Sequence, residues 1–115
     1  MQTPFRVEVR SDERATVLAI SGELDLASSP ALESELDRAF NAGDASMVIL
    51  DLRELEFMDS TGLSVLVKAH QRSQEAGRRF GLISGGPQVQ RLLSLTGVAE
   101  RMTVADSLEE LLHGG

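Results

Sequence analysis

Apolar and polar residues alternate at the start of the chain, with the two-residue period of a β-strand. Phe5, Val7 and Val9 alternate with charged residues, which predicts a strand with one solvent-facing side. A polar turn at 11–14 separates this strand from a second, more apolar strand over 15–20. The two strands are close enough in sequence to pair as an antiparallel hairpin at one edge of a sheet.

Four later stretches change to the spacing of an amphipathic helix. The first begins at Ser28-Ser29-Pro30, since a serine cap with proline in the first turn is typical of a helix N-terminus. It ends at Asn41-Ala42-Gly43, where Gly43 suits a left-handed position. Asp106 and Glu109 have the spacing of a capping box for the last helix. The positions that share one helical face are Leu32, Leu36, Ala39 and Phe40; Leu63, Leu66, Val67 and His70; Val89, Leu92, Leu93 and Thr96; and Leu108, Leu111 and Leu112.

Three further strands lie between these helices. The apolar run 47–52 predicts a strand buried on both faces, and shorter strands are expected at 79–84 and 102–104. The resulting order is β-β-α-β-α-β-α-β-α, and strand–helix alternation implies a mainly parallel sheet with right-handed crossovers. The first hairpin makes the sheet mixed. We therefore expect one α/β domain spanning residues 1–115, without repeats or linkers.

Composition removes several classes of site. The 115-residue chain is 42% hydrophobic, and a chain of this size buries about two-thirds of its unfolded surface, so it needs no disulfide or metal. It has no cysteine, which excludes thiol catalysis, disulfides and cysteine zinc sites. His70 and His113 are too few and too far apart for a usual zinc centre. We expect neither a metal nor a cofactor.

The charge and the apolar runs limit the partners. The net charge is −7, so no cationic face for nucleic-acid phosphates is visible, and an acidic domain prefers a basic partner. Without Trp or Tyr, the aromatic platforms that stack bases are missing. No apolar run approaches the roughly 18–20 residues of a membrane span, and the N-terminus does not resemble a signal peptide. We expect a soluble, cytoplasmic protein.

The segment Asp59-Ser60-Thr61 carries the most specific chemistry. It lies where the chain leaves a sheet and begins a helix, so its hydroxyls face the positive end of the helix dipole. A phosphate on Ser60 would be favoured there and would change the surface sharply. The simpler interpretation is that Asp59 or Ser60 only caps the helix, and the two roles are compatible. Gly62 would let a partner's backbone approach closely, because it has no side chain.

Asp25 is a second candidate. It follows the second predicted strand, while Asp51 and Asp59 leave or follow the third. Because the carboxyl ends of parallel strands meet at one edge, Asp25 and Asp59 would flank Ser60 on one acidic surface. An ordinary turn residue is an equally good interpretation of Asp25.

No catalytic constellation can be assembled. An aspartyl-phosphate receiver centred on Asp51 would need an acidic cluster for Mg²⁺ and a lysine, but no lysine follows Lys68. A serine hydrolase would need a Gly-x-Ser-x-Gly elbow, and Ser60 lacks the preceding glycine. The Gly85-Gly86-Pro87 turn lacks the lysine and the spacing of a phosphate-binding loop. We therefore expect that the protein is not an enzyme.

Three sequence segments resemble the bacterial STAS-domain anti-sigma-factor antagonists. They are Val48-Ile49-Leu50-Asp51-Leu52 with Phe57-Met58-Asp59-Ser60-Thr61-Gly62-Leu63, the segment Ser21-Gly22-Glu23-Leu24-Asp25, and Ser94-Leu95-Thr96-Gly97-Val98. The resemblance covers nearly the whole chain, and the Asp-Ser-Thr-Gly-Leu motif is its most specific part.

The resemblance implies a regulator that switches partners. In this family the unphosphorylated antagonist binds an anti-sigma factor, which is itself a serine-protein kinase, and so frees a sigma factor. Phosphorylation of the motif serine ends the binding, and a phosphatase restores it. By motif position Ser60 would be the acceptor, with Thr61 a weaker second one. The partner surface would comprise Asp25, Asp59, Ser60, Thr61, Gly62 and Leu63. The alternative that the family allows is a scaffold in a stressosome-like assembly or an accessory subunit of a lipid-transport ABC system.

Overall fold

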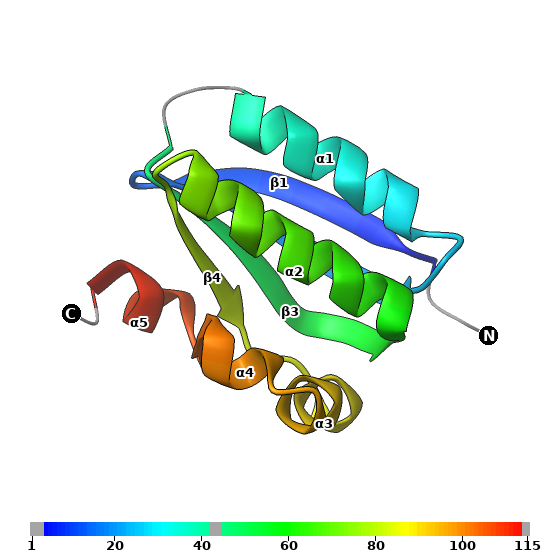
Figure 1. Cartoon of the computed structure of the whole chain (residues 1–115). Coiled ribbons are helices and arrows are strands. Elements are labelled where there is room, and N and C mark those ends of the chain that lie inside the picture. Colours follow the sequence, from blue (N-terminus) through cyan, green and yellow to red (C-terminus); the bar gives the residue numbers. More distant parts are fainter. Residues whose placement is uncertain (1–3, 42–44, 114–115) are drawn as a thin grey trace.

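The computed structural model describes residues 4–41 and 45–113, and they form a mixed five-stranded sheet (Figure 1). The strands lie in the spatial order of the sequence: β1 (Arg6–Asp12), β2 (Ala15–Leu24), β3 (Met47–Met58), β4 (Arg79–Ile83) and β5 (Thr103–Ala105). The β1–β2 pair is antiparallel, and every other pair is parallel. The predicted hairpin at the edge of a mainly parallel sheet is therefore confirmed.

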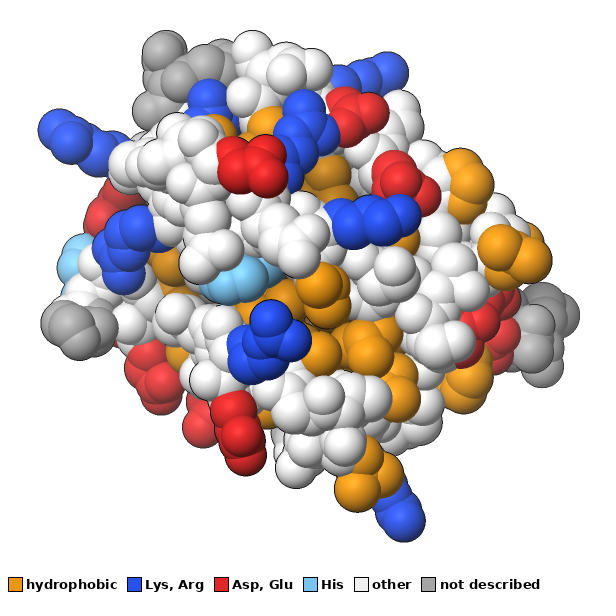
Figure 2. All heavy atoms as spheres, in the orientation of Figure 1, with side chains coloured by type: hydrophobic (Ala, Val, Ile, Leu, Met, Phe, Trp, Pro, Cys, Tyr) orange, Lys and Arg blue, Asp and Glu red, His pale blue; other side chains and the backbone are white. Residues whose placement is uncertain are grey.

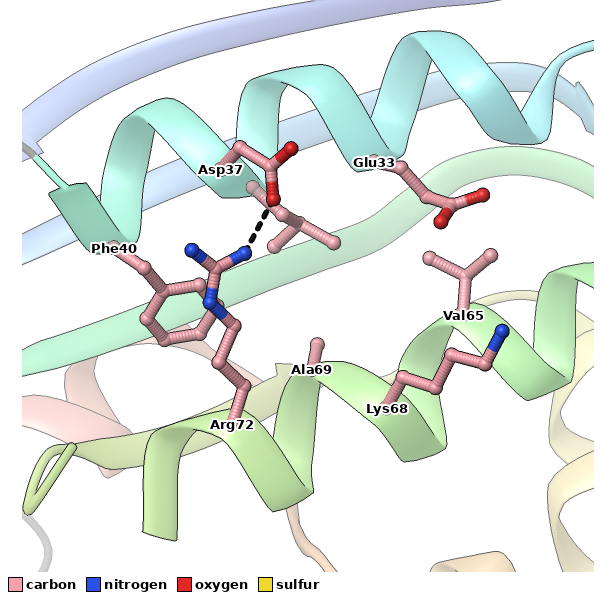
Figure 3. A pocket seen from close by; sticks show the side chains of 8 residues that line it. Glu33, Asp37, Phe40, Val65, Lys68, Ala69 and Arg72 are labelled. Carbon is pink, nitrogen blue, oxygen red and sulfur yellow. Dashed lines mark hydrogen bonds and ion pairs between the residues drawn. The ribbon is translucent and has the colours of Figure 1, made fainter. Parts of the chain in front are cut away.

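The described helices are α1 (Ser29–Asn41), α2 (Ser60–Glu75), α3 (Pro87–Leu95), α4 (Val98–Arg101) and α5 (Leu108–His113). Helices α1 and α2 lie side by side over one face of the sheet (Figure 1). Figure 3 shows Arg72 reaching from α2 to α1, where it forms an ion pair with Asp37 and lies 4.9 Å from the centre of the Phe40 ring. This contact ties together the two helices that follow β2 and β3.

The core lies on both faces of the sheet. Val48, Leu50 and Leu52 of β3 belong to the larger cluster with α1 and α2, while Met47 and Ile49 pack in a smaller cluster with α5. Successive side chains of a strand point to opposite faces, so this division shows that β3 is covered on both sides. The prediction of a strand buried on both faces over 47–52 is confirmed.

Both central strands are longer than the sequence predicts. The apolar runs end near residues 20 and 52, but β2 continues to Leu24 and β3 to Met58. The extension is irregular, with register shifts between Ala19 and Ser21 and again between Gly22 and Glu23. A β-bulge changes the direction in which the following side chains point. A strand can therefore continue through polar residues after the regular alternation of apolar residues has ended.

The prediction for the helix α2 needs correction. The buried face of α2 is rotated from the one predicted: only Leu66 of the predicted set is buried, and Leu63, Val67 and His70 are half-buried. The buried positions of α2 are Gly62, Val65, Leu66, Ala69 and Ser73. The rotation arises because α2 packs against both α1 and the sheet, so its buried stripe includes small residues that an apolar count passes over.

The C-terminal part also departs from the predicted order. Gly97 ends α3 with a left-handed φ of 77°, as expected, but the short helix α4 follows it and was not predicted. The cap of α5 is one residue later than predicted: Ser107 Oγ accepts from Glu110 N at 3.3 Å, and Glu110 accepts from Asp106 N. The predicted C-terminal glycine of the first helix, Gly43, lies outside the described residues.

Candidate functional site

Ser60 is the first residue of α2 and is exposed. Asp59 is the N-cap: its backbone is extended, and its Oδ1 accepts a hydrogen bond from Gly62 N at 3.0 Å. The capping interpretation is therefore correct for Asp59. Within the described part of the chain, no hydrogen bond involves the Ser60 hydroxyl, so capping leaves this group accessible.

Asp25 and Asp59 lie at the same edge of the sheet. Leu24 pairs with Met58 at the ends of β2 and β3, and Asp59 N donates to Leu24 O at 3.2 Å. Asp25 and Asp59 are thus the first residues beyond two paired, parallel strands. We call the end of the sheet formed by Asp25, Asp59 and Ser60 the Ser60 edge.

Asp25 also organises the turn into α1. Its Oδ1 accepts from Ala27 N at 3.0 Å and from Ser28 N at 3.1 Å, and its backbone oxygen accepts from Ser29 Oγ at 2.6 Å. These bonds confirm the turn interpretation that the sequence left open. They also hold a half-buried carboxylate in a fixed position next to the cap of α2.

Gly62 is buried, and its missing side chain faces the interior of the protein. A Cβ atom built on Gly62 would lie 2.7 Å from Leu24 Cγ and 2.8 Å from Met58 Cγ. The sequence suggested that Gly62 gives a partner access, but the structure supplies a different reason for glycine here. It lets the first turn of α2 press against the ends of β2 and β3, while Thr61 and Leu63 on either side remain half-buried.

Asp51 is not part of the Ser60 edge. It is buried within β3 rather than at its end, and both of its oxygens bind the Arg53 side chain, at 3.0 and 2.8 Å. Burial raises the pKa of Asp51, but the hydrogen bonds from Arg53 and the charges of Arg53 and Arg10 outweigh it and hold the pKa below its ordinary value. The carboxylate is already paired inside the strand, an arrangement that serves the fold.

Two features of the site were not predicted from the sequence. Leu26 and Phe57 are exposed by 75% and 39%, and they lie next to Asp25 and just before Met58. Gln88 of α3 clamps the end of β3, accepting from Met58 N at 3.0 Å and donating to Met58 O at 2.9 Å. The sequence around Leu26 and Gln88 does not indicate these roles, because the roles depend on residues that are distant in the chain.

Among residues 4–41 and 45–113, no group of three or more acidic, His or Cys side chains could hold a metal ion. His70 is half-buried on α2, with its ring centre 6.0 Å from that of Phe80. The chemistry of the Ser60 edge therefore consists of one free hydroxyl, two fixed carboxylates and a helix N-terminus.

Comparisons with known proteins agree with this architecture. An anti-sigma F factor antagonist of Paenibacillus polymyxa is 28% identical over 103 residues, which cover 90% of this chain and 88% of that protein. The crystal structure of an anti-sigma factor antagonist from Mycobacterium paratuberculosis superposes with a TM-score of 0.88 at 25% identity, covering 96% of this chain and 93% of that one. The Bacillus cell fate determinant SpoIIAA in its phosphorylated form shares the fold, with a TM-score of 0.70 at 22% identity and coverage of 95% and 96%.

The family comparison covers both ends of the fold. The family model of the STAS domain matches residues 6–111, from the first residue of β1 to the buried leucine of α5. The match includes every strand of the mixed sheet and all of the Ser60 edge. The resemblance seen in the sequence motifs is confirmed, and the chain belongs to the STAS domain family.

Proposed function

We propose that this protein is an anti-sigma-factor antagonist controlled by phosphorylation of Ser60. In its unphosphorylated form it binds an anti-sigma factor that is also a serine-protein kinase, and the bound sigma factor is released. The kinase transfers a phosphoryl group to Ser60, which ends the binding, and a phosphatase restores the active form. The protein is a regulator rather than an enzyme and acts in the cytoplasm, where sigma factors work. No helix within the described residues has the length and apolar character to cross a membrane.

The observation that carries this proposal is the exposed, unbonded hydroxyl of Ser60 at the same end of the sheet as two carboxylates that hydrogen bonds hold in place. A kinase must reach the hydroxyl it modifies, and a loop-to-helix junction provides that access. Relatives of this chain are named as antagonists of anti-sigma factors, and one structure of the same fold is of a phosphorylated protein.

The charges explain how one phosphate can act as a switch. Phosphorylation adds about −1.5 to −2 charges next to Asp59 and Asp25. In the free protein, water and the N-terminus of α2 solvate this charge. In a complex the same charge would be buried beside two carboxylates, which is costly unless a cation pairs with it. Phosphorylation therefore opposes docking without any need to change the fold.

The exposed apolar residues beside the Ser60 edge support a protein as the partner. Leu26 follows Asp25 directly, Phe57 lies two residues before Asp59, and both expose apolar surface. An apolar group among charges is typical of the centre of a protein interface. With a chain charge of −7, the complementary partner carries basic side chains around an apolar pocket.

The acceptor site is tested by incubating the purified chain with ATP and each small serine-protein kinase of the source bacterium, followed by mass spectrometry of the peptides. We expect one phosphate, on Ser60, and none in Ser60→Ala. Ser64→Ala is the matched control, because Ser64 is an exposed serine one turn later on the same helix, and it should be phosphorylated at the normal rate. Thr61→Val measures any second acceptor. A phosphate that persists at its full level in Ser60→Ala would contradict the proposal.

Leu26→Ser should weaken binding to the anti-sigma factor about 10-fold or more. A buried Leu side chain contributes about 1.5–3 kcal/mol, and a factor of ten in affinity corresponds to about 1.4 kcal/mol. The control is Leu95→Ser, since Leu95 is also 75% exposed. Leu95 lies at the end of α3, roughly 10 Å along the helix from Gln88, the residue of α3 that contacts Met58. Calorimetric titration of both variants checks this, and an equal effect of the two changes would show that Leu26 has no special role.

A further inference from the structure

A second hollow of the surface lies between α2 and α4, away from the Ser60 edge. It has a volume of about 230 Å³, compared with about 70 Å³ for the cavity between α1 and α2. Figure 2 shows hydrophobic side chains exposed on the surface between α2 and the α3–α4 segment. A water molecule occupies about 30 Å³, so the hollow has room for seven or eight groups of that size. It is large enough for a small organic molecule, and the function proposed above does not use it.

His70 is the first polar group of the hollow. Its Nδ1 is buried and has no hydrogen-bond partner, although the residue as a whole is only half-buried and lines the hollow. Unpaired buried donors are rarer in proteins than unpaired buried acceptors, so the proton of the neutral ring belongs on Nε2. The other ring nitrogen is then an N–H donor on the accessible side of the imidazole.

The other polar side chains of the hollow can also donate hydrogen bonds, although the two glutamine amides carry an acceptor oxygen as well. Arg101, at the end of α4, lines the hollow, and it is exposed and belongs to none of the ion pairs found in the part of the chain that the structure describes. The amides of Gln71 and Gln74, also at the hollow, can each donate two hydrogen bonds. No carboxylate of the described residues lines this hollow.

The rest of the lining is apolar. Val67 is half-buried, while Val98 and Met102 are buried, so the three form a floor beneath the polar groups. A site with an apolar floor and a few convergent polar groups is the usual form of a small-molecule pocket. Here every polar side chain can donate a hydrogen bond, Arg101 is a cation, and no carboxylate of the described residues lines the hollow, so the matching ligand ends in an anion that accepts several hydrogen bonds.

We propose that the hollow between α2 and α4 binds a small aliphatic monocarboxylate. The carboxylate binds the Arg101 guanidinium and His70 Nε2–H, and a short alkyl chain of about five to seven carbons lies on Val67, Val98 and Met102. A phosphate-bearing ligand fits less well, because Arg101 is the one Lys or Arg among the described residues that line the site. The site is separate from Ser60, so the experiment that tests this ligand proposal does not test the proposed function.

The test is a titration of the full chain with hexanoate, followed by ¹⁵N-NMR and calorimetry. We expect saturable shifts at the backbone amides of His70 and Arg101, and at least tenfold weaker binding of 1-hexanol, which has the same chain without the charge. Arg101→Gln should weaken hexanoate binding at least tenfold, and Val67→Phe should abolish it by filling the hollow.

The matched control is Arg91→Gln, which removes one exposed positive charge on α3, outside the hollow. It should bind hexanoate as the unchanged chain does. Equal binding of hexanoate and 1-hexanol, an unchanged affinity in Arg101→Gln, or the absence of saturable binding would overturn the proposal. Phosphorylation of Ser60 and binding of the anti-sigma factor would be unaffected by any of these results.

Discussion

Phosphorylation of Ser60 is expected to weaken binding of the anti-sigma factor by about 10²–10³-fold, or roughly 3–4 kcal/mol. The hydroxyl is exposed at the first residue of α2, so the partner can cover it closely in the unmodified state. After modification, the phosphate and the carboxylates of Asp59 and Asp25 would share one desolvated interface. Ser60→Ala removes the acceptor without adding charge, so it should bind with nearly the affinity of the unmodified chain.

Calorimetric titration of the unmodified, phosphorylated and Ser60→Ala forms with the anti-sigma factor measures this effect. Asp59→Asn isolates the electrostatic part, because asparagine is as good an N-cap as aspartate but carries no charge. If repulsion between phosphate and carboxylate weakens the complex, phosphorylation should cost less in Asp59→Asn than in the unchanged chain. Equal affinity of the phosphorylated and unmodified chains would refute the switch. An undiminished loss in Asp59→Asn would instead assign the effect to the bulk of the phosphate.

The sequence predicts the fold well because its elements have strong and separate periods. The run 47–52 is apolar at every position but one and is buried on both faces. The faces of α1 and α5 follow their leucine spacing, with Leu32, Leu36 and Leu111 all buried. The predictions fail where tertiary contacts override local pattern. The ends of β2 and β3 are bulged and lack the regular apolar alternation, and they remain strands because they pair with each other and because Gln88 binds the backbone of Met58.

The same distinction applies to the candidate site. Asp25, Asp59 and Ser60 could be placed at one edge from the sequence, because the carboxyl ends of parallel strands meet there and the strand order is simple. The clamp of Gln88 on Met58 joins residues 30 positions apart, and no local pattern marks it. The sequence places Asp51 near this edge because the expected strand ends at residue 52. The longer β3 leaves it inside the sheet, paired with Arg53.

Gly62→Val is expected to lower the free energy of unfolding by about 2–3 kcal/mol, the upper range for overpacking a core. A side chain at this position meets Leu24 and Met58, whose side chains are buried at the ends of β2 and β3, so one of these elements must shift. Gly62→Ala should cost less, about 1–2 kcal/mol, because alanine favours the helix more than glycine does and offsets part of the clash. Urea denaturation followed by circular dichroism measures both changes.

The matched control is Gly86→Ala, at the N-cap of α3. A Cβ there has no neighbour within 4 Å, and the extended backbone of Gly86 suits any residue, so the change should cost no more than about 0.5–1 kcal/mol. The comparison decides between two roles for Gly62. If Gly62→Ala keeps the full stability of the chain but loses the partner, glycine serves close approach, as the sequence suggested. If Gly62→Ala instead lowers the free energy of unfolding, the glycine serves internal packing. It then lets the first turn of α2 pack against β2 and β3, which holds Ser60 at the surface next to Asp25.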